Sequence, residues 1–152
     1  MRFVRNALCG VVAMCAALVV GTGTASAQGP GVRAGVSVDP DQVYVGGHYE
    51  TEELIESLYL RPNLEVGFGD DVTTVAVNIE AIYKYALRNH RDTRVYAGGG
   101  PAINLYDRDD GSDAKGGLNL LGGIEFGKVF FEVKGGLFDS PSLKVGIGYT
   151  FR

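Results

Sequence analysis

The most informative segment of the sequence is Leu143-Lys-Val-Gly-Ile-Gly-Tyr-Thr-Phe151, close to the C-terminus. Every second residue in it is apolar or aromatic, and the residues between are a lysine, two glycines and a threonine. A period of two residues is typical of a β-strand with one apolar face and one polar face. The stretch is therefore predicted to be an amphipathic strand, and it ends on an aromatic residue.

The same alternation recurs seven times earlier in the chain. The other predicted strands are Gly31 to Val38, Val43 to Tyr49, Leu58 to Phe68, Val72 to Tyr85, Arg94 to Tyr106, Gly117 to Phe126 and Val129 to Leu137. Turn residues separate them at Asp39–Asp41, Gly69–Asp71, Asp107–Gly116, Gly127–Lys128 and Asp139–Ser142. An even number of consecutive strands predicts an all-β fold, an eight-stranded antiparallel up-and-down transmembrane β-barrel.

Two features oppose a plain strand assignment. Pro62 and Pro101 lie inside predicted strands, and each is expected to require a bulge or a break because proline has no backbone donor. The acidic segment Glu50 to Ser57 is interpreted as a loop or a helical turn.

The N-terminal segment has the pattern of a secretory signal peptide. A basic start with Arg2 and Arg5 precedes an apolar run, and the segment ends in the small-residue cleavage site Ala25-Ser-Ala27. We therefore divide the chain into a signal peptide, residues 1–27, and an outer-membrane barrel domain, residues 28–152. Both cysteines, Cys9 and Cys15, fall in the signal peptide, so the domain has neither disulfides nor thiolate chemistry.

The charge of the predicted domain argues against a nucleic-acid partner. Without Arg2 and Arg5, twelve basic and eighteen acidic residues remain, a formal charge of −6. Phosphate backbones require a basic surface. No stretch of the domain is long and apolar enough for a transmembrane helix. The 23 glycines favour β structure with close backbone approach.

The polar face of the strands decides which face lies inside. A soluble lipocalin-like barrel has its apolar residues inside, whereas a membrane barrel has them outside. Here the polar face alternates glycines with acidic and basic residues in near balance, which is typical of a crowded ionic interior, because buried charges need partners. The predicted interior ionic network is Arg33, Arg61, Glu65, Glu80, Glu125, Glu132, Lys134 and Lys144. The aromatic residues predicted to form girdles at the lipid–water interfaces are Tyr49, Phe68, Tyr83, Tyr85, Phe126, Phe131, Tyr149 and Phe151.

Signal peptide, eight amphipathic strands, glycine-rich polar face and aromatic closing strand together resemble the small outer-membrane β-barrel proteins of Gram-negative bacteria. The opacity/OmpX-like and OmpA-barrel type is the most similar. The resemblance implies an integral outer-membrane monomer in contact with membrane lipids. It also implies recognition of Tyr149 and Phe151 by the barrel-assembly machinery. Family members usually end on the aromatic residue, whereas here Arg152 follows Phe151.

No catalytic, cofactor or metal constellation stands out. The two histidines, His48 and His90, lack the serine and acid spacing of barrel enzymes that act on lipid A. Asp107–Asp113 fails the EF-hand pattern at its fifth and twelfth positions. Gly98–Gly100 lies within a strand, so it is not a phosphate loop. We therefore predict a protein that is not an enzyme and has no cofactor and no metal.

These observations predict a non-enzymatic outer-membrane barrel with a plugged polar interior and a structural or surface-interaction role. Two alternatives stay open at this point. One is a narrow outer-membrane channel, porin-like, for small or hydrophobic solutes. The other is a soluble periplasmic lipocalin-like binder.

Overall fold

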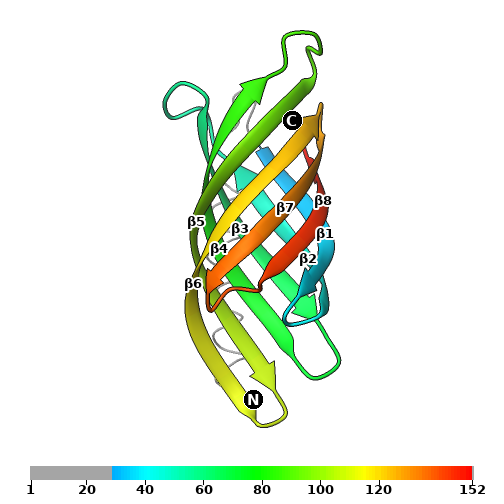
Figure 1. Cartoon of the computed structure of the whole chain (residues 1–152), viewed down its shortest axis with the longest axis vertical. Helices are drawn as coiled ribbons and strands as arrows, with labels where there is room; N and C mark the ends of the chain where they lie inside the picture. Colours follow the sequence, from blue (N-terminus) through cyan, green and yellow to red (C-terminus); the bar gives the residue numbers. More distant parts are fainter. Residues whose placement is uncertain (1–28, 152) are drawn as a thin grey trace.

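The chain folds into one closed β-barrel (Figure 1). The computed structural model describes residues 29–151, so the predicted signal peptide with its two cysteines lies outside the described residues. The strands are β1 (Gly29–Val38), β2 (Gln42–Glu50), β3 (Leu58–Phe68), β4 (Thr73–Ala86), β5 (Thr93–Arg108), β6 (Gly111–Phe126), β7 (Val129–Phe138) and β8 (Leu143–Thr150). Each strand pairs antiparallel with its neighbours in the sequence, and β1 pairs with β8. The prediction of an eight-stranded antiparallel β-barrel is confirmed.

The strand order gives the barrel two distinct ends. Gly31 of β1 pairs with Thr150 of β8, so the start of β1 and the end of β8 lie together. We call this end, with the connections 51–57, 87–92 and 127–128, the terminal end. The opposite end carries the turns 39–41, 69–72, 109–110 and 139–142, and we call it the far end.

The β5–β6 hairpin extends well beyond the turn that the sequence predicted. The segment from Asp107 to Gly116 is mostly strand, because the ladder continues to the pair Arg108↔Gly111 and leaves only two residues in the turn. Two strands of a hairpin can pair along their whole length when a two-residue turn joins them. Gly111 follows this turn and has a positive φ of 139°, which glycine adopts readily. The aspartates and glycines of this segment therefore do not mark a long loop, and the hairpin projects from the far end (Figure 1).

The two prolines interrupt hydrogen bonding without shifting the register. The β4–β5 ladder has the pairs Asn78↔Ala102 and Ala81↔Gly99 and skips the two pairs between them, beside Pro101. The β2–β3 ladder stops at Asn63, next to Pro62. The expected break is therefore found in the ladder on one side of each proline, where the missing donor removes ladder contacts. No bulge forms, because both strands keep a constant register.

The segment after Glu50 is a loop rather than a helical turn. Glu50 is the last residue of β2, and two backbone hydrogen bonds hold the loop beyond it: Thr51 N to Leu60 O at 3.0 Å and Leu54 N to Leu58 O at 2.9 Å. The helical alternative is therefore wrong. Across residues 29–151 the structure has no helix of the length and apolar character that a membrane crossing requires.

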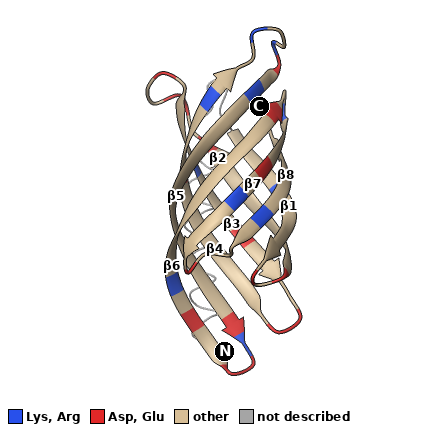
Figure 2. Cartoon of the chain, in the orientation of Figure 1, with Lys and Arg blue, Asp and Glu red and all other residues tan. Residues whose placement is uncertain are grey.

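The two faces of the barrel wall have opposite character. Outward positions carry apolar side chains that are about half exposed, such as Val36 at 53% and Val145 at 45%. Inward positions carry glycines and buried polar or charged side chains. Charged residues therefore occur along the strands as well as in the turns (Figure 2). The buried apolar cluster is small, consisting of Ile82, Tyr96, Leu121 and Phe130.

Candidate functional site

Among residues 29–151, ten buried charged side chains lie in the lumen, and their formal charges sum to zero. Eight strands leave an interior just wide enough for side chains, so these groups meet across the barrel. None of the ten residues is more than 6% exposed. The carboxylates are Glu50, Glu65, Glu80, Glu125 and Glu132, and the cations are Arg33, Arg61, Lys84, Lys134 and Lys144. We call these ten residues the ionic cluster.

Lys134 and Arg33 organise the middle of the ionic cluster. Lys134 projects from β7, and its Nζ lies 2.5 Å from Glu80 Oε1 of β4 and 3.0 Å from Glu65 Oε1 of β3. Arg33 of β1 places Nη1 3.2 Å from both Glu65 Oε1 and Glu132 Oε1. The pairs therefore connect strands that are not neighbours in the sheet.

Lys144 continues the ionic cluster toward the far end. Its Nζ donates to Glu65 Oε2 at 2.7 Å, so Glu65 accepts from three different cations. Beside Lys144 lies a cavity of about 10 Å³, lined in part by Tyr44 and Thr74. That volume is close to the minimum for a single water molecule.

Arg61 continues the ionic cluster toward the terminal end. Its Nη1 donates to Glu132 Oε2 and its Nη2 to Glu50 Oε2, each at 2.9 Å. Glu50 in turn accepts from Lys84 Nζ at 2.6 Å, and Lys84 also donates to Glu125 Oε2 at 2.7 Å. Ion pairs therefore run without a gap from Lys144 near the far end to Glu125 near the terminal end.

A phenyl ring packs inside the lumen beside the arginines. Phe130 of β7 is 1% exposed, and its ring centroid lies 4.8 Å from the Arg61 guanidinium carbon and 5.5 Å from that of Arg33. This arrangement is a cation–π contact with both arginines. Tyr96 lies edge-on to Phe130 and donates its hydroxyl to Glu132 Oε2 at 2.9 Å.

The structure places all eight residues of the predicted ionic network in the lumen, and each has at least one ion pair. Sequence reasoning missed Glu50 and Phe130 as members of the site, and it placed Lys84 on the inward polar face without including it in the network. Glu50 lies one residue beyond the predicted end of the second strand and therefore falls in the predicted acidic loop, whereas in the structure it is the last residue of β2. Phe130 shares the inward parity of Glu132, so the alternation of β7 contained the signal for it.

The other residues singled out by the sequence have separate locations. Tyr149 and Phe151 lie on the outer surface at the terminal end, with ring centroids 5.1 Å apart. His48 is buried, and its Nε2 lies 3.0 Å from Thr150 Oγ1. His90 lies in the exposed β4–β5 connection. Residues 29–151 include no group of three or more His, Cys, Asp or Glu side chains arranged to hold a metal ion.

The predicted aromatic girdles are concentrated at one end of the barrel. Only Phe68 lies at the far end, and the other seven predicted girdle residues lie in the terminal half. Phe138, which the prediction did not include, lies at the far end and is 83% exposed.

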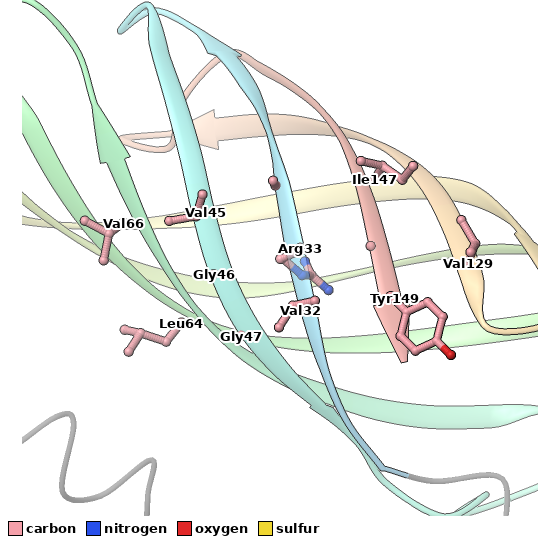
Figure 3. A pocket seen from close by; sticks show the side chains of 12 residues that line it. Val32, Arg33, Val45, Gly46, Gly47, Leu64, Val66, Val129, Ile147 and Tyr149 are labelled. Carbon is pink, nitrogen blue, oxygen red and sulfur yellow. The ribbon is translucent and has the colours of Figure 1, made fainter. Parts of the chain in front are cut away.

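A shallow apolar groove of about 670 Å³ runs over the outer wall at β1 and β2. Its floor is formed at Ala34 and Gly47, where the outward side chain is a methyl group or absent. The side chains of Val32, Leu64 and Ile147 stand around it (Figure 3). The groove is part of the exposed apolar surface, and Arg33 of the ionic cluster is among the residues that line it.

Comparison with known proteins identifies a similar fold but no family. No family model matches the chain, and no curated protein matches it. A solved structure that resembles it is the N-terminal β-barrel domain of Pseudomonas aeruginosa OprF, with a TM-score of 0.57 and 16% identity. The match covers 80% of this chain and 96% of that chain. The chain has the fold of a small OmpA-type barrel. The OmpX-like part of the predicted resemblance stays a prediction.

Proposed function

We propose that this protein is an integral outer-membrane β-barrel, not an enzyme, whose lumen is plugged by the ionic cluster and whose role is structural or surface-interacting. One observation carries the proposal: the barrel has charged side chains inside and apolar side chains outside. A water-soluble barrel requires the reverse arrangement, so this distribution opposes the lipocalin-like alternative. The likeness to the OprF barrel domain supports the same conclusion at the level of the fold.

The outer wall has the composition that lipid contact requires. Half-exposed valines, leucines and isoleucines cover it along the barrel, for example Val45, Ile79, Ile103 and Leu120. In water, a continuous apolar surface of this kind promotes association, since monomeric soluble proteins expose only small apolar patches. In a bilayer the same surface is solvated by acyl chains, and we propose membrane lipids as its partner and a monomer as its state.

The ionic cluster supports a plug rather than a pore. Arg33, Arg61 and Lys134 extend across the lumen, and each meets carboxylates from other strands at 3.2 Å or less. Removing such groups from water is costly unless every charge is paired, and the equal numbers of carboxylates and cations meet that condition. A solute passing through would have to break several of these ion pairs at once.

Assembly into the membrane is proposed to use the closing strand. Tyr149 and Phe151 are exposed on the outer surface, next to the strand pair β1–β8 that closes the barrel. We propose that the barrel-assembly machinery recognises this pair of rings. Replacing both by alanine should reduce the amount of folded barrel in the outer membrane while leaving refolding in detergent intact.

Membrane fractionation with heat-modifiable gel mobility tests the membrane assignment. We expect the protein in the outer-membrane fraction, resistant to extraction without detergent, with a mobility that changes on boiling. Recovery as a monodisperse folded protein in the soluble periplasmic fraction would overturn it. Planar-bilayer recording tests the plug separately, and a large steady conductance would favour the channel alternative.

A further inference from the structure

The turn between β7 and β8 does not extend away from the barrel but folds over its far end. Ser140 and Pro141 are buried, and Ser140 is only 8% exposed although it lies in a turn. We propose that residues 139–142 form a hinged cap that closes the far mouth of the lumen and opens about Phe138. This inference rests on the barrel fold and is independent of whether the ionic cluster blocks conduction.

Two side chains of β5 hold the cap closed. Tyr106 donates its hydroxyl to the carbonyl oxygen of Asp139 at 2.9 Å. Asn104 donates Nδ2 to the same oxygen at 3.2 Å and to Ser140 Oγ at 3.4 Å. Because β6 lies between β5 and β7 in the sheet, these bonds pass over the end of β6 rather than connecting adjacent strands. These bonds form the latch. Two exposed contacts also hold the cap: Asp139 Oδ1 lies 3.6 Å from Lys115 Nζ of β6, and Ser142 donates its hydroxyl to Asp39 Oδ2 at 3.1 Å.

Two inward-facing glycines form the seat on which the cap rests. A Cβ atom on Gly136 would collide with the carbonyl oxygen of Pro141, and one on Gly117 would collide with Ser140 Oγ. Either approach is closer than van der Waals packing allows, so the cap fits only because these positions have no side chain. Their sequence neighbours Gly135 and Gly116 differ, since a Cβ there meets nothing within 4 Å.

Phe138 joins the cap to β7 in a strained conformation. Its φ is 63°, in the left-handed region that non-glycine residues rarely adopt, and its ring is 83% exposed. Because the ring is largely exposed, its packing does not hold the backbone in this conformation. The closed cap on one side of Phe138 and the β6–β7 ladder on the other side hold it instead. Strained backbone of this kind is found in switch regions, where release of strain favours the alternative state.

The polar cavity beside Lys144 lies next to the latch that holds the cap. Thr74 lines this cavity and pairs with Tyr106 across β4–β5, so it lies directly beside the latch. Thr74 is 3% exposed, and its hydroxyl has no hydrogen-bond partner among the described residues. Opening the cap is expected to admit water to Thr74 and then to the Lys144–Glu65 ion pair.

Cysteine labelling measures the opening directly, because residues 29–151 contain no cysteine. Thr74→Cys places a thiol of nearly equal volume in the cavity, and a charged thiol reagent reports its access in detergent micelles. We expect slow labelling of this thiol in the otherwise unchanged barrel. Gly136→Ala lifts the cap from its seat and should accelerate labelling at least tenfold, whereas the matched variant Gly135→Ala should not change it.

Relaxing the hinge should act in the opposite direction. Phe138→Gly removes the penalty of the left-handed conformation, which stabilises the closed cap and should slow labelling at position 74 about fivefold or more. Phe138→Ala removes the ring but retains the strained backbone. If Phe138→Gly slows labelling at position 74 and Phe138→Ala does not, the effect comes from the backbone and not from the side chain. Asn104→Ala combined with Tyr106→Phe opens the latch and should accelerate labelling as Gly136→Ala does.

A second reporter distinguishes cap opening from general loosening of the barrel. Thr150 is fully buried at the terminal end, and the thiol introduced by Thr150→Cys should label slowly in every variant. Equal labelling at position 74 in the Gly136→Ala and Gly135→Ala variants would overturn the proposal. Fast labelling at position 74 with an intact cap, or parallel acceleration at positions 74 and 150, would overturn it as well.

Discussion

The Phe130 ring lies directly over Gly148. The two residues are paired across β7–β8, and a Cβ atom on Gly148 would collide with the ring. The same arrangement recurs where the ring of Tyr96 lies over its partner Gly123. Each of these large inward rings therefore occupies the space that its cross-strand partner leaves empty, and this explains why both partners are glycine.

Gly148→Ala should destabilise the barrel by about 1–3 kcal/mol, the usual cost of overpacking a filled interior. The added methyl group must displace Phe130, which also contacts the guanidinium of Arg61. Urea unfolding followed by gel mobility checks this. Gly135→Ala is the control, since its Cβ meets open space, and an equal effect of both substitutions would contradict the packing argument.

Glu132→Ala should destabilise the barrel by about 3–5 kcal/mol, because it leaves buried cations without a partner. Glu132 accepts from Arg61 at 2.9 Å and from Arg33 at 3.2 Å. Glu132→Gln retains the side-chain volume but removes the charge. If the charge is responsible, this variant should lose nearly as much stability as Glu132→Ala. An unfolding midpoint for Glu132→Gln equal to that of the unmodified protein would show that water screens this site.

An exposed ion pair provides the comparison for Glu132. Lys115 Nζ lies 3.9 Å from Asp113 Oδ2, and both side chains are well exposed on the β5–β6 hairpin. Asp113→Ala should change the stability by less than about 1 kcal/mol, as is usual for surface pairs. If Asp113→Ala destabilised the barrel as much as Glu132→Ala, burial would not explain the difference expected between the exposed ion pair and the ionic cluster.

Removing one partner of a buried pair should cost more than removing both. Lys134→Ala leaves Glu80 without the cation that lies 2.5 Å away. The double variant Lys134→Ala with Glu80→Ala removes equal and opposite charges, and it should be the more stable of the two. A double variant that is less stable than Lys134→Ala alone would contradict this electrostatic account. Planar-bilayer recording on the same double variant should show increased conductance if these side chains block the lumen.

Val145→Arg should destabilise the barrel by about 2–4 kcal/mol if the residue lies near the middle of a bilayer. Val145 points outward from β8 and is 45% exposed, between Val36 and Val133 on the neighbouring strands. Refolding into lipid vesicles measures the cost, and Val145→Leu should be silent. Unimpaired refolding of Val145→Arg into lipid would argue that this face does not contact hydrocarbon.

The strands and the character of their two faces follow from the amino-acid sequence alone. Alternation in a segment such as Leu143–Phe151 is a local property of the chain, so it predicted eight strands and the inward position of residues such as Glu132 without knowledge of any contact. Sequence patterns predict a segment less well where its composition is typical of a loop but its strand neighbour continues the β-ladder. The aspartates of 107–113 suggested a loop, but pairing with the neighbouring strand extended the hairpin through most of that segment.

Which charges meet depends on how the strands close into a barrel. Lys134 reaches Glu80 across 54 positions of sequence, and Arg33 reaches Glu132 across 99. Periodicity gives the direction in which a side chain points, but it does not give the stagger and tilt that bring particular levels of opposite strands together in a closed barrel. The pairing of Glu50 with Arg61, the place of Phe130 between two arginines and the folding of residues 139–142 over the mouth all depend on that closure.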